Sequence, residues 1–112
     1  MKRIAHYAPP PAEALARLKT ELGFTSPQMA DLTGLAQGAQ WRKYTGGAEP
    51  RALGLHMHFY MAALLTLSDA ELARVVATMR AQGADFELGP LPAGPVTKAD
   101  PEFYQRFIDD TQ

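Results

Sequence analysis

Apolar residues recur at three- and four-residue intervals in five successive stretches of the chain, which is the spacing of helices that bury one side. Residues that start or stop helices separate these stretches. The pattern therefore predicts an all-α fold of five helices, followed by a C-terminal loop and a short helix.

The first predicted helix covers 12–22, with Leu15, Leu18 and Leu22 on one side. An arm at 1–11 precedes it. Three consecutive prolines in this arm favour an extended conformation and exclude the interior of a helix.

The second predicted helix is short and has two alternative starts. Thr25 with Gln28 forms a capping box, whereas Ser26 followed by Pro27 gives a cap one residue later. Gly34 ends the helix, because glycine readily takes a positive φ.

The third predicted helix lies in the stretch AQGAQWRKYTGG, residues 36–47. Trp41 and Tyr44 share one side by their three-residue spacing, and we assign both to the core rather than to stacking on bases. The polar residues around the rest of the helix are Gln37, Gln40, Arg42 and Lys43.

The fourth predicted helix, 51–67, is the most apolar segment and is expected to be the buried centre of the fold, with Gly54 as a weak point. The fifth covers 68–83 and starts at a capping box of Ser68 and Glu71. Its apolar stripe consists of Leu72, Val75, Val76 and Met79.

Residues 84–112 form a predicted C-terminal extension. A Pro- and Gly-rich loop is expected to pack through Phe86, Leu88 and Leu91. A short helix from Pro101 then carries four large apolar residues, so we expect it to dock on its own body or on another subunit. These residues are Phe103, Tyr104, Phe107 and Ile108.

The chain has 112 residues, 46% of them hydrophobic, which suits one helical domain at 12–83 with the arm and the extension attached. It contains no cysteine, so disulfides and thiolate metal sites are excluded. No apolar run has the length of a signal peptide core or a membrane span, and we expect a cytoplasmic protein.

Charge is unevenly distributed along the chain. Residues 1–67 contain seven Lys and Arg against four Asp and Glu, a net charge of +3, whereas 68–112 contain four against eight, a net charge of −4. A polyanionic partner is therefore expected to meet the first half. The alternative is a chance asymmetry in a small protein.

A two-turn helix, a glycine turn and a short polar-faced helix, flanked by two further helices, follow the order of a helix-turn-helix unit. Residues 18–50, LKTELGFTSPQMADLTGLAQGAQWRKYTGGAEP, resemble the lambda-repressor-like, or xenobiotic-response-element, family of phage and bacterial regulators. Two features depart from the family pattern. Ser26 replaces a common glutamine, and the turn between Leu35 and Trp41 is one residue longer, with Gly38 accommodating the extra residue. The residues that carry the match are Leu18, Gly23, Thr25, Met29, Ala30, Leu32, Gly34, Leu35, Trp41, Arg42, Lys43, Tyr44, Gly47 and Pro50.

The resemblance implies a five-helix domain that binds double-stranded DNA as a homodimer on a palindromic operator. The fifth helix and the aromatic tail are then expected to supply the dimer contact, because the DNA-facing side cannot. The expected function is that of a transcriptional regulator that acts as a repressor. No cofactor is expected.

The candidate base contacts lie on the third helix. A carboxamide matches the donor and acceptor of adenine in the major groove, which makes Gln37 and Gln40 candidates for adenine. Arg42 is a candidate for guanine or a phosphate and Lys43 for a phosphate. The alternative for all four is an ordinary solvated surface.

Candidate phosphate contacts flank this helix. Thr25 and Ser26 begin the second helix, whose backbone N–H groups point outward, and the alternative is that both only cap it. Thr45, Gly46 and Arg51 follow on the other side.

Cations near the N-terminus and two histidines of the fourth predicted helix are further candidates. Lys2 and Arg3 are candidates for an arm that tracks DNA, with a frayed terminus as the alternative. His56 and His58 are two residues apart, which points their rings to different sides and argues against a metal site, so one of them is expected at a subunit contact or in a hydrogen bond to the backbone.

The sequence contains no pattern typical of an enzyme. Ser26 and Ser68 are the only serines, and neither lies in a nucleophile elbow. GGAEP lacks the Lys-Ser/Thr of a phosphate-binding loop. An alternative function is a protein-binding adaptor, or an antitoxin-like or phage-type inhibitor, on the same scaffold, suggested by the weak positive charge of the first half and the acidic, aromatic tail.

Overall fold

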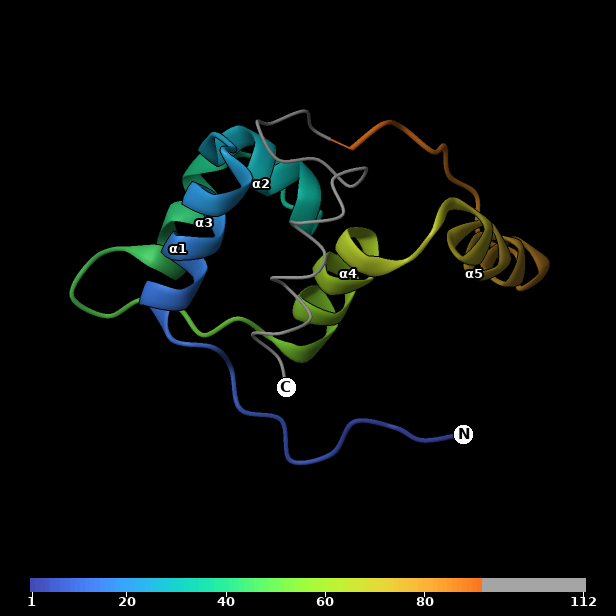
Figure 1. The fold of residues 1–112 in the computed structure, drawn as a ribbon, viewed down its shortest axis with the longest axis horizontal. Helices are drawn as coiled ribbons and strands as arrows, with labels where there is room; N and C mark the ends of the chain where they lie inside the picture. The colour runs from blue at the N-terminus through green and yellow to red at the C-terminus, as the bar shows by residue number, and fades with distance from the viewer. Residues whose placement is uncertain (92–112) are drawn as a thin grey trace.

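The computed structural model describes residues 1–91, and within this part the chain contains five α-helices and no strand (Figure 1). The predicted all-α, five-helix fold class is confirmed. The predicted helix from Pro101 and the rest of 92–112 lie outside the described residues. The helices are α1 (Ala12–Leu22), α2 (Ser26–Thr33), α3 (Gly38–Thr45), α4 (Leu55–Thr66) and α5 (Asp69–Ala81).

The ends of α1 and α2 follow directly from local sequence. Gly23 and Gly34 cap their C-termini in the left-handed region, at φ 69° and 78°. Thr25 is the N-cap of α2, and its hydroxyl accepts a hydrogen bond from the Gln28 N–H at 3.3 Å. The Gln28 side chain in turn accepts from the Thr25 N–H at 2.8 Å. Of the two predicted starts, the capping box is therefore the one that forms.

The core lies where α1, α2 and α3 meet and α4 contacts α2 (Figure 1). Trp41 of α3 is completely buried at its centre. The buried residues packed together there are Leu15, Leu22, Phe24, Met29, Leu32, Trp41, Tyr44, Leu53, Met61 and Leu65. Although α2 has only two turns, it is stably held because α3 and α4 both pack against it.

Helix α4 starts later than predicted. It begins at Leu55 rather than at residue 51, with Gly54 as its N-cap in an extended conformation (φ −71°, ψ 158°). A glycine inside a helix is destabilising, so the helix starts just after Gly54. The preceding segment is extended: the Arg51 N–H donates to the Lys43 carbonyl at 2.7 Å, and Leu53 is buried in the core.

Helix α4 is also less buried than its composition predicts. Only Met61 and Leu65 are buried, whereas Phe59 and Tyr60 have exposed fractions of 61% and 48%. The interpretation of α4 as the buried centre is therefore wrong, because the core covers only one side of a helix that is apolar all round.

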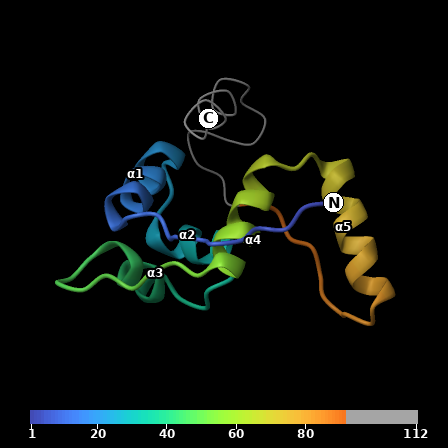
Figure 2. The same cartoon turned by 90° about the horizontal axis from the view of Figure 1, so that it is seen from below.

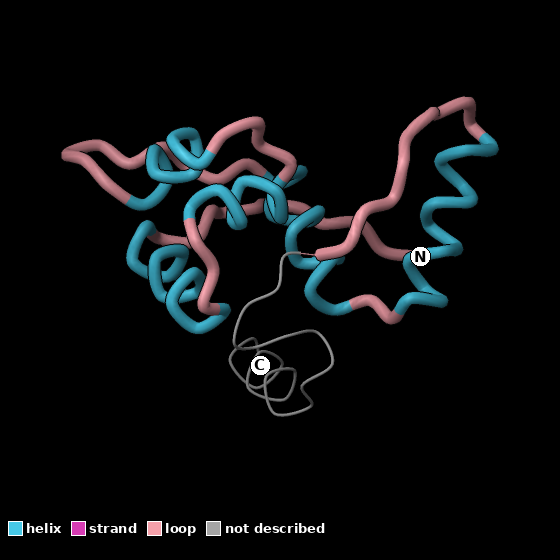
Figure 3. Tube along the Cα trace, turned by 90° about the horizontal axis from the view of Figure 1, so that it is seen from above, coloured by secondary structure: helices cyan, strands magenta, loops and turns pink. Residues whose placement is uncertain are grey.

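Helix α5 stands apart from the other four helices (Figures 2 and 3). Its predicted capping box is present, with the Ser68 hydroxyl accepting from the Glu71 N–H at 3.1 Å. Only Val76 of its apolar stripe is buried, and among the described residues α5 contributes nothing to the main core. Val75 and Met79 are exposed by 46% and 42%, so the stripe exists but does not face the core.

The segment after α5 returns toward the body. The Arg80 guanidinium lies over the Phe86 ring, 4.8 Å from its centroid, and donates to the Phe86 carbonyl at 3.4 Å. Leu91 packs against the main core as predicted. Leu88 is exposed, so its predicted packing is wrong.

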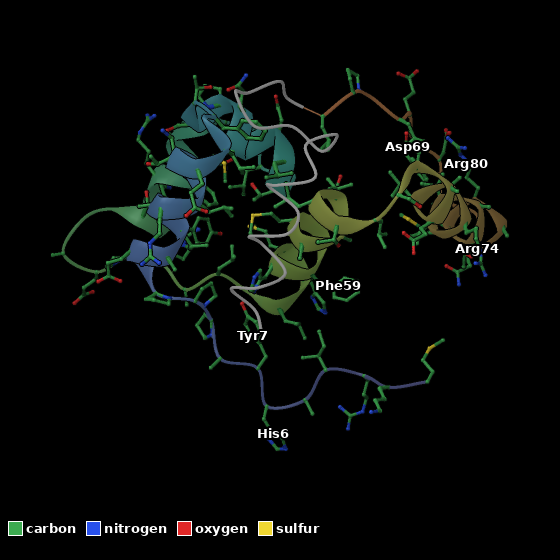
Figure 4. All side chains as sticks on the ribbon, viewed as in Figure 1. His6, Tyr7, Phe59, Asp69, Arg74 and Arg80 are labelled. Atoms are coloured by element: carbon green, nitrogen blue, oxygen red, sulfur yellow. The ribbon has the colours of Figure 1, made fainter. Side chains whose placement is uncertain are left out.

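The N-terminal arm is extended and tied to the body through Tyr7. The Tyr7 hydroxyl donates to the Leu53 carbonyl at 2.7 Å and lies 3.2 Å from Nδ1 of His58. Figure 4 shows Tyr7 pointing toward the body and His6 pointing away from it. Burial raises the pKa of Tyr7 and lowers the pKa of His58. The partner of His58 is thus the side chain of Tyr7, and the prediction that one of His56 and His58 lies at a subunit contact or bonds to the backbone stays a prediction.

Candidate nucleic-acid interface

Helices α2 and α3 touch at their N-termini through Gly38. A Cβ on this residue would lie 2.8 Å from the Pro27 nitrogen and 3.0 Å from the Ser26 carbonyl carbon. Any larger residue would therefore push the helices apart. Gly38 is the first residue of α3 and not part of the turn, which covers 34–37. The prediction that Gly38 accommodates an extra turn residue is wrong, because its role is this close contact.

Helix α3 presents one side to the core and the other to solvent. Trp41 and Tyr44 are both buried, with ring centroids 6.4 Å apart, so their predicted place in the core is confirmed. At about 100° per residue, Ala39 and Lys43 point away from Trp41, with Gln40 and Arg42 on the two flanks. These four residues are all exposed.

Ala39 was not among the candidate residues because it is small and uncharged. It nevertheless occupies the middle of the outward side of α3, one turn before Lys43. An exposed alanine at such a position can contact the methyl group of thymine in the major groove. The signal that identifies it in the sequence is its spacing of four residues from Lys43, on the side of the helix opposite Trp41.

Gln40 has a structural role at the start of α3. Its Oε1 accepts hydrogen bonds from the backbone N–H groups of Ala36 at 2.9 Å and Gln37 at 3.1 Å. Two donors occupy both lone pairs of this oxygen, so pairing with adenine through oxygen and nitrogen together requires release of the cap. In this conformation the amide N–H₂ of Gln40 can still donate to a base or a phosphate.

The cationic candidates lie along and beyond α3. Arg42 and Lys43 are exposed on α3, and residues 34–48 contain no acidic residue to offset their charge. Arg51 lies over the ring of Tyr44, 6.0 Å from its centroid, which places its guanidinium beside the C-terminal half of α3. Thr45 is half-buried.

The start of α2 lies next to the start of α3, through the contact at Gly38. Thr25 is exposed and Ser26 is half-buried there. The Thr25 hydroxyl accepts in the capping box, which leaves its O–H able to donate to a phosphate oxygen. The structure thus brings Thr25 and Ser26 close to Gln37 and Gln40.

Lys2 and Arg3 are not part of this surface. The N-terminus lies at the α5 end of the molecule, away from α3 (Figures 1 and 2). In this position the arm does not extend the surface around α3.

Comparison with protein-family models, with curated proteins and with solved structures finds no match to this chain. The resemblance to the lambda-repressor-like family therefore stays a prediction. Within residues 1–91, no helix is long and apolar enough to cross a membrane, and no three His, Asp or Glu side chains come together as a metal site would need.

Proposed function

We propose that this protein is a transcriptional regulator that binds specific double-stranded DNA sequences as a homodimer, with α3 in the major groove. The observation that carries the proposal is the arrangement of α3. Its aromatic side is locked in the core, its outward side carries polar and cationic residues, and its start touches the start of α2. A helix held in this way is what a helix-turn-helix protein inserts into DNA.

The outward side of α3 supplies groups of the kinds that read base edges. Arg42 offers a planar fork that matches guanine, and Gln37 a carboxamide that matches adenine. Ala39 offers a methyl contact for thymine, and the amide N–H₂ of Gln40 a further donor. These contacts provide the sequence specificity of the proposed complex.

The phosphate contacts would come from the two ends of the same unit. The Thr25 hydroxyl at the start of α2 and the positive end of the helix dipole favour an anion. The N–H groups of Thr25 and Gln28 are already bonded in the capping box, so the hydroxyl is the group offered to a phosphate. Lys43 and Arg51 provide charge toward the C-terminal end of α3. Contacts on both sides of the groove fix the orientation of α3 on the duplex.

Repression is the mode we propose, because a small protein bound over a promoter blocks transcription by occupancy alone. A DNA-binding function would also place the protein in the cytoplasm. A reporter gene controlled by a selected site tests repression, because repression requires that expression falls when the protein is present.

The first experiment selects binding sites for the full chain from a random duplex library at low salt. Selected duplexes are then compared in mobility-shift titrations with the variant Arg42→Glu/Lys43→Glu. We expect this variant to lose the shift, because two attractive charges on α3 become repulsive. A milder variant, Lys43→Ala, should reduce the slope of log K against log salt by about 1 if one phosphate contact is lost.

The matched control is Lys2→Glu/Arg74→Glu, which changes net charge equally but lies at the α5 end of the molecule. It should bind the selected duplexes like the unchanged protein. If no sequence is enriched, or if the α3 and control variants bind equally well, the proposed function is wrong.

The exposed apolar residues Phe59, Val75 and Met79 favour a second candidate function, a protein-binding adaptor or inhibitor. Such a protein would keep its partner when Arg42 and Lys43 are reversed. Loss of DNA binding and of function in cells by the same α3 variant would exclude this alternative.

A further inference from the structure

The amide of Gln40 is held in one orientation at the start of α3. Its Oε1 accepts hydrogen bonds from the N–H of Ala36 at 2.9 Å and from the N–H of Gln37 at 3.1 Å. Exchange of the amide oxygen and nitrogen would set an NH₂ group against two N–H donors, so the backbone decides this orientation. The oxygen points to the backbone, and Nε2 is the end of the side chain that is left for a ligand.

The Nε2 group lies where a helix in the major groove contacts bases. Gln40 is the third residue of α3, and its side chain turns back to the residues just before the helix. In helix-turn-helix complexes the first residues of the recognition helix contact the base edges. Gln40 is exposed, and within residues 1–91 its Nε2 makes no hydrogen bond. The side chain thus offers two N–H donors and no free acceptor.

A group with donors alone distinguishes the four bases in the major groove. Guanine presents two adjacent acceptors, N7 and O6, and no donor. Thymine presents one acceptor, O4, and adenine places its N6 donor next to N7. Cytosine presents only a donor, which repels another donor. Guanine is therefore the preferred base and cytosine the least favoured one.

Recognition of adenine through both ends of the carboxamide would require Gln40 to leave its cap. The hydrogen bonds to Ala36 and Gln37 would break, and their N–H groups would lose their partner at the surface that faces the DNA. The cap also orders the side chain before DNA binds, so that less conformational entropy is lost in the complex. Both effects favour the capped form of Gln40, which can only donate.

We propose that Gln40 selects a guanine at one position of each DNA half-site while its oxygen stays in the cap of α3. The inference rests on the proposed function, because it requires α3 to enter the major groove. It replaces the adenine expected for this residue from the sequence, since a carboxamide matches adenine only when both of its ends are free. A hydrogen bond within the protein thereby determines which base the protein reads.

The variant Gln40→Glu separates reading from capping. One carboxylate oxygen can replace Oε1 in the cap, where the positive end of the helix dipole favours a negative charge. The other oxygen replaces the NH₂ group, so a donor becomes an acceptor with little change of shape. Sites that this variant selects from a random duplex library should lose the guanine at one position of each half-site. A base with a donor, cytosine or adenine, should take its place.

Mobility-shift titrations measure the exchange of preference. The unchanged protein should bind its selected site roughly tenfold more tightly than the same site with cytosine at this position, and Gln40→Glu should reverse the order. Gln37→Glu is the matched control, because it adds the same charge three residues earlier. It should weaken binding through repulsion from phosphates but keep the guanine that Gln40 selects.

The cap is followed without DNA by amide hydrogen exchange. The N–H groups of Ala36 and Gln37 should be protected in the unchanged protein and in Gln40→Glu, and should exchange faster in Gln40→Ala. A purely structural role of Gln40 would produce the same exchange pattern but would not change the selected base. The two roles are therefore measured independently.

A modified base tests the same contact without changing the protein. 7-Deazaguanine at the selected position replaces the N7 acceptor by a C–H group, and should weaken binding of the unchanged protein roughly fivefold. Gln40→Ala should bind the modified and the ordinary duplex equally well, because the donor is already absent.

The inference is wrong if Gln40→Glu selects the same guanines as the unchanged protein, or if 7-deazaguanine weakens Gln40→Ala as much as the unchanged protein. Loss of an adenine or a thymine in place of the guanine would also overturn it. If the unchanged protein enriches no sequence, the proposed function fails and this inference fails with it. An enriched site that does not depend on Gln40 would overturn this inference alone and leave the proposed function standing.

Discussion

Gly38 sets the distance between α2 and α3. We expect Gly38→Ala to lower the free energy of unfolding by about 1–3 kcal/mol, because the added Cβ overlaps the Pro27 ring and backbone and the helices must shift. Urea denaturation followed by Trp41 fluorescence measures this change. The control is Gly89→Ala, where nothing lies within 4 Å of the added Cβ. Equal stability of the two variants would show that the contact at Gly38 adapts without cost.

His58 makes stability depend on pH. Tyr7 gives its hydroxyl proton to the Leu53 carbonyl, so Nδ1 of His58 must donate to the Tyr7 oxygen. Both the neutral and the charged ring can donate this hydrogen bond, so the bond does not favour either form. Burial, which lowers the pKa of His58, therefore decides how stability changes with pH.

The unfolded chain therefore binds a proton near the ordinary histidine pKa of about 6.5, whereas the folded chain binds it only at lower pH. The free energy of unfolding should be constant above the ordinary histidine pKa and should fall as the pH drops from there through the lowered pKa of the folded protein. Urea midpoints between about pH 8 and pH 5 measure this fall, and His58→Gln should flatten it. An identical pH profile in the variant would assign the fall to other groups.

At the scale of the helix, α5 depends on its own sequence more than on its neighbours. Because no other helix in the described chain packs closely along it, its N-cap carries much of its stability. We expect Ser68→Ala to destabilise α5 locally by about 0.5–2 kcal/mol, seen as faster amide exchange in α5 at dilute concentration.

The amides of α2 and α3 should exchange as before in this variant, because α5 contributes nothing to their core. Thr25→Ala is the matched comparison, since it removes the cap of a helix that is packed on two sides and should lower the midpoint of global unfolding. Faster exchange throughout the chain in Ser68→Ala, in α2 and α3 as much as in α5, would contradict the local role of the cap.

Local rules predict the ends of α1, α2 and α5 correctly, because glycine stops and capping boxes act within a few residues. They also place Trp41 and Tyr44 in the core, since a three-residue spacing fixes a common side. The start of α4 differs from the prediction because residues 51–54 are extended, and the Arg51 N–H donates to the Lys43 carbonyl. No local sequence signal predicts this contact, because it depends on how the segment packs on the core. The exposure of Val75 and Met79 differs because a stripe indicates that a helix has an apolar side and not what covers it.

The sequence also predicts only part of the candidate site. The exposure of Arg42 and Lys43 follows from the positions of the buried aromatic residues. The cap made by Gln40 and the contact made by Gly38 could not be predicted, because they depend on how the start of α3 meets Ala36 and Pro27. Sequence thus identifies the helix and its outward side, whereas the tertiary contacts decide which polar atoms remain available.

Charge is unevenly distributed over the molecule, and in the part that the structure describes the proposed DNA-binding helix α3 lies in a region without acidic residues. The chain as a whole is slightly acidic, with a net charge of −1. Around α3, however, Arg42 and Lys43 face solvent without an acidic residue between 34 and 48. If the proposed function is right, long-range attraction to DNA is weak and specific contacts must supply most of the affinity.

The homodimer that the proposed function requires would hold two copies of α3 at a fixed separation and orientation. Two-fold symmetry predicts that the selected DNA is a palindrome, with half-sites separated by a whole number of helical turns of about 10–10.5 bp. Inserting 5 bp between the half-sites turns one of them to the opposite side of the duplex, so only one α3 can bind. Affinity should fall at least tenfold and the remaining complex should contain one half-site contact, both visible by titration and footprinting. Equal affinity for the duplexes with and without the insertion would show that one dimer does not bind the two half-sites together.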